Sequence, residues 1–532
     1  MMKNIKTQET IIKDLTKLSR NELENSFVKL ETQVEELSAK IAWYEEQYRL
    51  SKQKIFGSSS EKTDGLQISL FNEPEAESVP INIEPTLETV TYKRKKKNSR
   101  KEQLPDNLPV ETIEYRLSPE EQLCPQCGES LHEMSKEIRQ ELKIIPAQVT
   151  VVEHIRYVYS CRNCEKNEIT TPVITAPMPN PVIKGSLASP SFISYVMTRK
   201  YVEALPLYRQ EQQFERSGII LSRQTLSNWM IRSSNDWLSP IYNRMHSILV
   251  QKEVLHADET VLEVLNEPGR PAQTNSYMWM YRTSGDEVPI VLYEYKVSRS
   301  GDHPKIFLKN FKGFIHVDGY AGYHKVENAT LVGCWAHARR KITDALKALP
   351  KDTPISTTAA SKGLEYCNQL FAIERELVEL TYEERYEQRL LRSKAVVNAF
   401  FAWLEIQKEQ VLPKSSFGSA VTYCLNQRKK LEAFLLDGRL ELSNNRGERA
   451  IKPFVIGRKN WLFSNTPKGA ASSAVIYSVV ETAKENKLNL FEYLKYLFEQ
   501  LPNVDITDLN TIDKYLPWSD CLPQICKAPI KA

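Results

Sequence analysis

Apolar residues recur every seven positions near the beginning of the chain. Between residues 20 and 50 two such series interleave: Leu23, Leu30, Leu37 and Tyr44, and Phe27, Val34, Ile41 and Tyr48. Glu and Lys fill most of the positions between them. Heptads of this kind are typical of a coiled coil, so we predict that residues 20–50 join copies of the chain in a homo-oligomer. A single amphipathic helix packed on its own chain is the alternative.

The hydrophobic period is lost after the heptads. Residues 58–88 are rich in Ser, Glu and Pro, a composition that predicts a flexible acidic linker. A block of five Lys and Arg residues follows at 93–97. This block carries enough charge to neutralise several DNA phosphates, but a solvated charge run that keeps a linker extended is an equal alternative.

Strand-like alternation returns at 149–159, between two Cys-x-x-Cys pairs. A hairpin there would bring together four thiols: Cys124, Cys127, Cys161 and Cys164. Four thiolates suit tetrahedral Zn²⁺ and leave no open coordination position, so we predict a structural zinc ion. The other five of the nine cysteines, Cys334 among them, are expected to be ordinary thiols.

Residues 184–245 have the pattern of helices. A helix over 207–214 precedes Gly218, and Ser222 can cap a second helix whose Leu226 and Trp229 face inward. The polar side of that second helix carries Arg223, Gln224, Thr225, Ser227 and Asn228. This is the layout of a DNA-binding helix-turn-helix, for which a purely structural helical hairpin is the alternative.

A β-rich region then gives way to helices. We predict strands at 253–264, 277–283, 289–296, 312–318 and 330–335, which suggest one mixed sheet. Residues 338–440 have the pattern of a long helical insertion, and 470–500 that of two more helices. Roughly the last 30 residues contain several prolines and are expected to be loosely ordered.

Length and charge narrow the class of protein. A chain of 532 residues has material for roughly three or four domains. Its net charge of +4 is too small to indicate a polyanionic partner, so any DNA-binding argument depends on where the basic residues cluster. The N-terminus carries no apolar signal region, and no uninterrupted apolar stretch reaches membrane-spanning length. We expect a cytoplasmic protein without a membrane partner.

Three acids have contexts that could deliver them to one cleft. Asp258 and Asp318 end β-like runs, and Glu448 opens a helix-like segment. Taken singly, each resembles a turn or capping residue. Taken together, they could hold a divalent ion such as Mg²⁺. Two such ions about 4 Å apart can stabilise the attacking and leaving oxygens of a phosphoryl transfer.

Other polar residues lie close to these acids in the sequence. His256 shares a strand face with Asp258 and could contact substrate, whereas Glu259 points to the opposite face. His337 follows the last predicted strand and could lie beside the acids. Four basic residues could contact DNA phosphates or form a solvated face: Arg339, Arg340, Arg458 and Lys459.

The order of these motifs resembles the ribonuclease-H-like core of DDE transposases. More narrowly, the chain over about residues 20–500 is similar to transposases of the insertion-sequence-66 family. The matching motifs lie at 54–57, 60–62, 124–127, 205–209, 256–260, 318–323, 334–341, 444–449 and 457–463.

The resemblance implies a reaction, its cofactor and its partners. Asp258, Asp318 and Glu448 would be the catalytic ligands of Mg²⁺ or Mn²⁺, and the reaction would cut the ends of a mobile element and join them to target DNA. DNA and accessory proteins of the same element would be its partners, in the cytoplasm of a bacterium.

The expected fold is a multidomain α+β protein with a coiled coil, a zinc ribbon, a helix-turn-helix-like region and a ribonuclease-H-like α/β core that carries a helical insertion. The predicted order is a coiled-coil region at 1–57, an acidic then basic linker at 58–110, a zinc-binding domain at 111–175, a helix-turn-helix-like region at 184–245, the first part of the core at 250–337, the helical insertion at 338–440, the part of the core with Glu448 at 441–485, and a C-terminal element at 486–532.

Two other functions are compatible with the sequence. A divalent-metal nuclease would cut DNA without joining strands. A zinc-containing DNA-binding or regulatory protein would bind DNA without any catalysis. The presence of all three acids favours a catalytic protein over a regulatory one.

Overall fold

The computed structural model describes residue 34 and residues 149–160, 173–285, 287–350, 354 and 358–528. Apart from Val34, which is helical, the predicted coiled coil lies outside the described residues, as do the linker, the basic block and the four cysteines of the predicted zinc module. The chain divides into two compact units, residues 59–177 and the remainder.

The described part of the smaller unit is a short hairpin. β1 (Val158–Ser160) pairs with β2 (Val173–Thr175) in antiparallel fashion. Arg156 braces this hairpin by donating hydrogen bonds to Ala176 O at 2.6 Å and Thr175 Oγ1 at 2.8 Å. The alternating stretch before it, 149–157, is not a strand, and its Val151 and Ile155 side chains are exposed. The alternation therefore predicted a longer strand than the hairpin contains.

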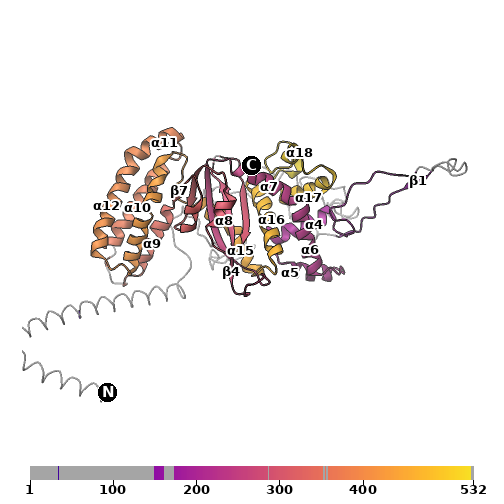
Figure 1. Ribbon diagram of the computed structural model, residues 1–532, viewed down its shortest axis with the longest axis horizontal. Coiled ribbons are helices and arrows are strands. Elements are labelled where there is room, and N and C mark those ends of the chain that lie inside the picture. The colour runs from indigo at the N-terminus through magenta and orange to yellow at the C-terminus, as the bar shows by residue number, and fades with distance from the viewer. Residues whose placement is uncertain are drawn as a thin grey trace, which may run out of the picture. The chain divides into compact units, whose positions relative to one another are not determined.

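A five-stranded mixed sheet forms the centre of the larger unit (Figure 1). Its order is β5-β4-β3-β6-β7, with antiparallel pairing from β5 to β3 and parallel pairing from β3 to β7. The strands are β3 (Val254–Glu263), β4 (Asn275–Thr283), β5 (Val291–Lys296), β6 (Gly313–Val317) and β7 (Ala329–Gly333). All five predicted strands are confirmed to within about two residues at each end.

Helix α16 (Pro467–Glu485) packs along β5, the strand at one edge of this sheet. The N–H groups of Val291 and Tyr293 donate to the hydroxyls of Thr482 at 2.9 Å and Ser478 at 2.8 Å. The Thr482 hydroxyl in turn donates to Val291 O at 3.0 Å. An edge strand needs partners for its outward backbone groups, and two small hydroxyl side chains one helical turn apart supply them here.

Helices before the sheet include the predicted helix-turn-helix-like pair. They are α4 (Pro190–Tyr201), α5 (Leu207–Arg216), α6 (Arg223–Ser233), a π-helical turn at Ser234–Leu238, and α7 (Ser239–Leu249). Ser222 caps α6 by accepting from Thr225 N at 3.1 Å. Leu226 and Trp229 are buried. The predicted cap and inward face of the second helix are therefore confirmed.

The stretch predicted as a helical insertion is helical, and a separate cluster of buried residues forms its core. Figure 1 shows its helices on the β7 side of the sheet. They are α9 (Trp335–Lys347), α10 (Ala359–Glu376), α11 (Tyr382–Gln388), α12 (Lys394–Gln410), α13 (Ser416–Asn426) and α14 (Arg428–Glu432). Trp335, Phe400 and Phe434 are central to this core. Buried Arg389 forms an ion pair with Glu374 and donates hydrogen bonds to the carbonyl oxygens of Asp437 and Leu440. These bonds connect the helices with the segment that follows Phe434.

The chain closes with α15 (Asn445–Trp461), α16, α17 (Leu490–Gln500) and α18 (Leu509–Asp513). The expectation of a loosely ordered C-terminus is wrong for the described residues up to 528. Leu516, Leu522 and Cys526 are buried, and Asn489 N donates to Cys526 O at 2.8 Å. These apolar residues have no helical or strand period, so a periodicity argument misses them although they pack in the core.

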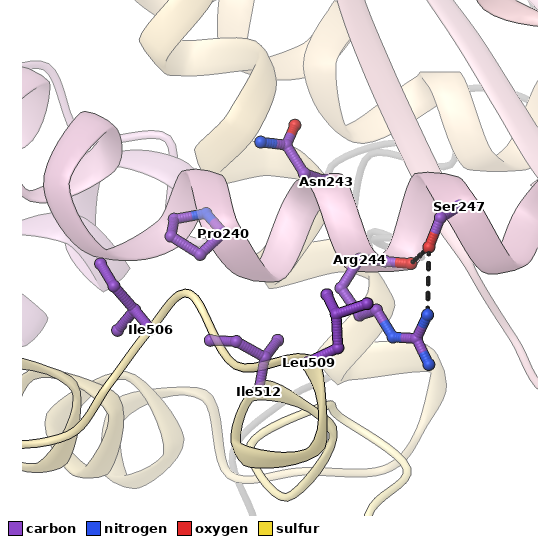
Figure 2. Close-up of a pocket in the computed structure, with 7 residues that line it drawn as sticks. All are labelled: Pro240, Asn243, Arg244, Ser247, Ile506, Leu509 and Ile512. Carbon is purple, nitrogen blue, oxygen red and sulfur yellow. Dashed lines mark hydrogen bonds between the residues drawn. The ribbon is translucent and has the colours of Figure 1, made fainter.

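A shallow pocket lies where the C-terminal segment meets α7 (Figure 2). Leu509 and Ile512 line it from one side and Pro240 from the other. Arg244 closes one end, where it forms a two-pronged ion pair with Asp513 at 2.6 and 2.8 Å. The pocket thus marks a docked C-terminal segment. None of the described helices is both long and apolar enough to cross a membrane.

Candidate active site

Strand pairing at the centre of the sheet brings Asp258 and Asp318 to adjacent positions. β3 and β6 run parallel, with His256 opposite His316. Extended by two residues, this register sets Asp258 on β3 opposite Asp318, which directly follows β6, and the charge of Asp318 acts on Asp258. Parallel strands lie about 4.8 Å apart, and residues two apart share a face of the sheet. Both acids therefore belong to the face that carries the two histidines.

This position is also where the order of strands across the sheet reverses. β4 and β5 follow on one side of β3, and β6 and β7 on the other. Open sheets bind ligands at such points, outside the carboxyl ends of the parallel strands. Asp258 ends the β-like run at 254–258, but β3 continues to Glu263, as the predicted strand at 253–264 requires. The end of β6, rather than the end of β3, sets the edge of the site.

Asn444 fixes the start of α15, and with it Glu448, against this edge. Its Oδ1 accepts from His256 Nδ1 at 2.9 Å, and its Nδ2 donates to Ala257 O at 2.9 Å. Its backbone N–H donates to Cys334 Sγ at 3.1 Å. One buried amide therefore connects the beginning of the helix with β3 and with the end of β7.

Glu448 does not act as a capping residue. The N-cap is Asn444, and no side chain caps the helix. The Glu448 carboxylate instead lies 3.5 Å from His337 Nδ1 and 3.5 Å from the Arg340 guanidinium. The interpretation of Glu448 as a capping residue is therefore wrong. Glu448 is directed out of its own helix and toward the end of β7.

The negative charges of neighbouring acids act on Asp258. Burial raises the pKa of Asp258 well above its ordinary value, and the negative charges of Glu259, Asp318 and Glu448 raise it further. A hydrogen bond from Glu259 N at 2.8 Å opposes this shift. Carboxylates that repel one another in a half-buried position are stabilised by a cation between them.

Glu259 is engaged elsewhere, as its position in the strand predicts. It accepts from Tyr323 OH at 2.5 Å and pairs with Arg299 on the other face of the sheet. Its side chain is only 1% exposed. Because its oxygens already have two strong donors, Glu259 is a poor metal ligand.

The two histidines on the acidic face are core residues. His256 and His316 are entirely buried and stack with their ring centroids 4.4 Å apart. Burial lowers the pKa of His256 to about 3, so the ring is neutral at physiological pH. The suggestion that His256 contacts substrate is therefore wrong. It is a positioning residue that holds Asn444.

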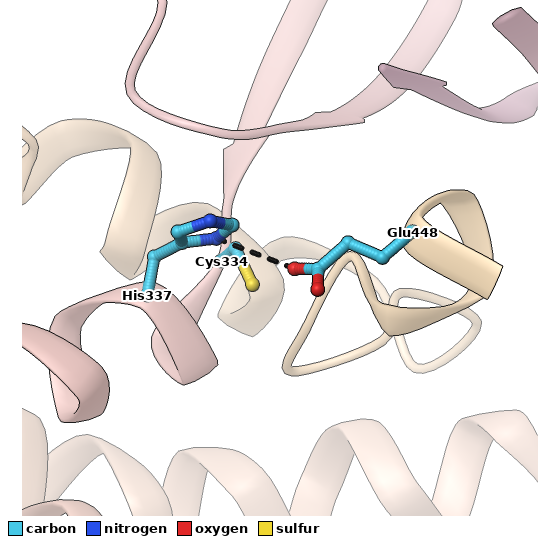
Figure 3. Close-up of side chains that lie close together, drawn as sticks. All are labelled: Cys334, His337 and Glu448. Carbon is cyan, nitrogen blue, oxygen red and sulfur yellow. Dashed lines mark ion pairs between the residues drawn. The ribbon is translucent and has the colours of Figure 1, made fainter. Parts of the chain in front are cut away.

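His337 does lie beside the acids, as predicted. Together with Cys334 and Glu448 it forms a group of three potential ligands whose donor atoms all lie within 4.8 Å of one another (Figure 3). Among the described residues, the carboxylates of Asp258, Asp318 and Glu448 do not form such a close group of three. Cys334 was expected to be an ordinary thiol, and its i, i+3 spacing to His337 at the start of α9 was the available signal.

The basic residues proposed for DNA contact have different surroundings. Arg339 donates to Asn368 Oδ1 at 2.9 Å, and Arg340 lies beside Glu448. Arg458 is half-buried and donates to Val261 O and Thr260 Oγ1 of β3, and this burial lowers its pKa. Lys459 is exposed. Arg458 therefore links α15 to β3 rather than presenting a free guanidinium.

The polar residues of α6 lie on its outer side. Arg223, Gln224 and Asn228 are exposed and Ser227 is half-buried. The Arg223 backbone N–H donates to Glu211 Oε1 at 2.8 Å, which joins α6 to α5. In contrast, Trp461 packs edge-on against Phe454 with ring centroids 5.5 Å apart and is a partly buried residue at the core.

Two residues near the acids, Asn444 and Lys430, were not predicted from the sequence as part of the site. Asn444 was seen only as part of a motif, because its three hydrogen bonds join segments far apart in the chain. Lys430 is buried, and this burial lowers its pKa while the charge of Asp318 raises it. Its neighbours Lys429 and Leu431 give no sign of this environment.

Family comparisons agree with this architecture. The family model described as Transposase IS66 family matches residues 185–472, and the model described as IS66 C-terminal element matches residues 478–518. Toward the N-terminus, zinc-finger binding domain of transposase IS66 matches 121–165, and Transposase C of IS166 homeodomain matches 43–113. The chain belongs to the IS66 family of transposases.

Similar proteins occur in Sinorhizobium fredii. Uncharacterized protein y4jD is 31% identical over 442 residues, which are 80% of this chain and 83% of that protein. Uncharacterized protein y4qI is 29% identical over 71% of this chain and 70% of its own length. Uncharacterized protein y4hP is 28% identical over 74% and 73%. No solved structure matches the chain.

Proposed function

We propose that this protein is a DNA transposase that cleaves the ends of an insertion sequence and joins them to target DNA by two-metal-ion phosphoryl transfer. We base the proposal on the parallel register of β3 and β6, which runs from the pair His256 and His316 toward Asp258 and Asp318. The charges of Asp318 and of Glu448 from α15 both act on Asp258. The mixed sheet with acids at its switch point supports a ribonuclease-H-like core.

Asp258, Asp318 and Glu448 would hold Mg²⁺ or Mn²⁺. The fit rests on three features: all-oxygen donors, the mutual repulsion that raises the pKa of Asp258, and a buried Glu448 Oε1 without a hydrogen-bond partner among the described groups. When bound, the ions supply an activated oxygen nucleophile and stabilise the leaving oxygen.

The chain's own residues would prepare this site. Asn444 sets the position of the first turn of α15, and the neutral His256 and His316 rings fill the space behind the acids. Glu259 keeps Arg299 and Tyr323 on the opposite face. Arg340 holds the Glu448 carboxylate in the structure and would turn to a DNA phosphate when a metal takes that carboxylate.

Other parts of the chain would recognise DNA and partners. The zinc module at 111–175, with Zn²⁺ on Cys124, Cys127, Cys161 and Cys164, and the helices at 184–245 would bind the element's ends. Exposed side chains of α6 and the basic residues Arg339, Arg340 and Lys459 would contact DNA. Residues 20–50 would join protomers, and accessory proteins of the same element would complete the assembly in a bacterial cell. The domain limits given by the sequence form part of this proposal.

Strand cleavage and joining test the proposal. The full chain is incubated with Mg²⁺ and DNA carrying the element's ends, and is compared with Asp318→Asn. Asp302→Asn, an exposed acid on the short helix α8 (Asp302–Phe307), is the matched control. We expect joined products from the natural chain and from the control, and none from Asp318→Asn.

The same assay separates the competing functions. Cleavage without joining, when accessory proteins are supplied, would indicate a divalent-metal nuclease. DNA binding without either reaction in all three proteins would indicate a regulatory DNA-binding protein. Equal joining by Asp318→Asn and the natural chain would contradict the assignment of the acids.

A further inference from the structure

A second group of potential metal ligands lies beside the three carboxylates. Cys334 precedes α9, His337 belongs to the first turn of α9, and Glu448 comes from α15 (Figure 3). One donor atom of each lies within 4.8 Å of the others. A thiol, an imidazole and a carboxylate form a donor set that suits Zn²⁺, unlike the all-oxygen set that suits Mg²⁺.

Two of these donor atoms are buried without a hydrogen-bond partner. His337 Nδ1 and Glu448 Oε1 lie 3.5 Å apart, and neither makes a hydrogen bond to another described group. Leaving buried polar atoms unpaired is costly. A tetrahedral zinc ion with bonds of about 2.0–2.3 Å holds its ligand atoms about 3.5 Å apart. The imidazole and carboxylate thus already have the separation that a shared zinc ion requires.

The surroundings of the Cys334 sulfur can support a thiolate once a metal is bound. Asn444 N–H donates to Sγ at 3.1 Å, and the N–H groups of Ala336 and His337 also favour the thiolate. Burial outweighs them and raises the pKa of the Cys334 thiol to about 11. A coordinating thiol is deprotonated by the metal itself, and its proton passes to solvent.

Arg340 is the group that opposes a cation here. It lies 3.5 Å from Glu448 Oε2 and 3.5 Å from His337 Nε2. Metal binding through Nδ1 places the ring proton on Nε2, so Arg340 must turn away. Its side chain is 49% exposed, which leaves room for that movement into solvent.

We propose that Cys334, His337 and Glu448 form a zinc site, with water as the fourth ligand, and that zinc bound there withdraws Glu448 from the magnesium site and inhibits DNA cleavage. The binding claim depends only on the three side chains. The inhibition claim rests on the function proposed above, since it requires Glu448 to serve the reaction.

Cobalt binding tests the site without reference to activity. The full chain carrying Cys124→Ser, Cys127→Ser, Cys161→Ser and Cys164→Ser, which removes all four thiols of the predicted zinc module, is titrated with Co²⁺ and followed by thiolate-to-cobalt absorption. We expect about one ion per chain with that absorption. Adding Cys334→Ala should abolish the absorption and weaken binding by about 10–100-fold or more. Cys424→Ala, which removes another buried thiol, is the matched control and should change neither.

A second variant guards against misfolding. If Cys334→Ala lowers the thermal unfolding temperature, His337→Gln replaces it and should also weaken cobalt binding by at least about tenfold. Thiolate absorption that persists in Cys334→Ala, or that is absent from the parent chain without the four thiols of the zinc module, would overturn the site.

Inhibition is measured separately. Zinc is added to the Mg²⁺-supported cleavage reaction, and each variant is compared with its own activity. The zinc concentration for half-inhibition should rise at least about tenfold in Cys334→Ala. Equal inhibition of both proteins would overturn the inhibitory role but not the site. A natural chain inactive with Mg²⁺ would count against the transposase proposal, while the cobalt titration would still decide whether the site exists.

Discussion

The two faces of β3 carry adjacent acids, Asp258 and Glu259, whose carboxylates have different hydrogen-bond and ion-pair partners. Glu259 is 1% exposed and is satisfied by Tyr323 and Arg299. Asp258 accepts one hydrogen bond from the adjacent backbone and forms no ion pair with any described residue, while Asp318 and Glu448 add negative charge around it. A carboxylate saturated by donors is structural, whereas one left among other carboxylates is suited to a cation. The difference between the faces is therefore chemical as well as geometric.

Replacing one acid on each face should give the largest effects, on DNA cleavage for one face and on the free energy of unfolding for the other. Asp258→Asn should lower single-turnover DNA cleavage by at least about a thousandfold, since a lost metal ligand costs several kcal/mol in the transition state. Glu259→Gln should instead lower the free energy of unfolding by about 1–3 kcal/mol, because it weakens buried hydrogen bonds. Cleavage kinetics and chemical denaturation of both variants measure the two effects.

The reverse outcome would reject the contrast between the two faces. Full cleavage by Asp258→Asn would remove that residue from the metal site. An unchanged unfolding free energy in Glu259→Gln would show that its network contributes little to the fold.

Asn444 should matter through position rather than chemistry. Asn444→Ala leaves His256 Nδ1 and Ala257 O without partners, so the free energy of unfolding should fall by about 1–3 kcal/mol. Cleavage should fall about 10–100-fold because the start of α15 is less well fixed. The neighbouring Asn445→Ala provides the control, since it removes none of these bonds. Equal effects of the two variants would contradict the role given to Asn444.

The buried histidine behind the acids should make stability depend on pH. The pKa of His256 in the folded protein is about 3, below its ordinary value of about 6.5, so only the unfolded chain binds this proton as the pH falls between those values. Stability is therefore lost with falling pH. From pH 7 to pH 5 the natural chain should lose about 2 kcal/mol more than His256→Gln. Equal losses, measured by urea denaturation at both pH values, would contradict a neutral His256.

The smallest expected effect distinguishes two adjacent basic residues. Arg458→Gln should lower the free energy of unfolding by about 1 kcal/mol, because Arg458 donates into β3. Lys459→Gln should reduce the salt dependence of DNA binding by about one phosphate contact. Fluorescence anisotropy over a range of salt concentrations checks the second effect. If Lys459→Gln lowered the free energy of unfolding and Arg458→Gln reduced the salt dependence of DNA binding, the roles given to the two residues would be wrong.

Local patterns predicted the elements of the fold but not how distant segments meet. Alternating apolar residues give all five strands, and Ser222 gives the cap of α6, because those signals are local. The register of β3 and β6, which leads toward Asp258 and Asp318, depends on pairing between segments about 60 residues apart, so no local pattern could give it. Asn444, Cys334 and Arg458 acquire their contacts the same way, through side chains that meet only in the folded protein.

The most direct test of the central claim is to locate metal ions in crystals of the full chain bound to its DNA ends. Mn²⁺ is soaked in and identified by its anomalous scattering. We expect two ions about 4 Å apart, bound by Asp258, Asp318 and Glu448. Manganese absent from these carboxylates while the DNA end occupies the cleft would contradict it.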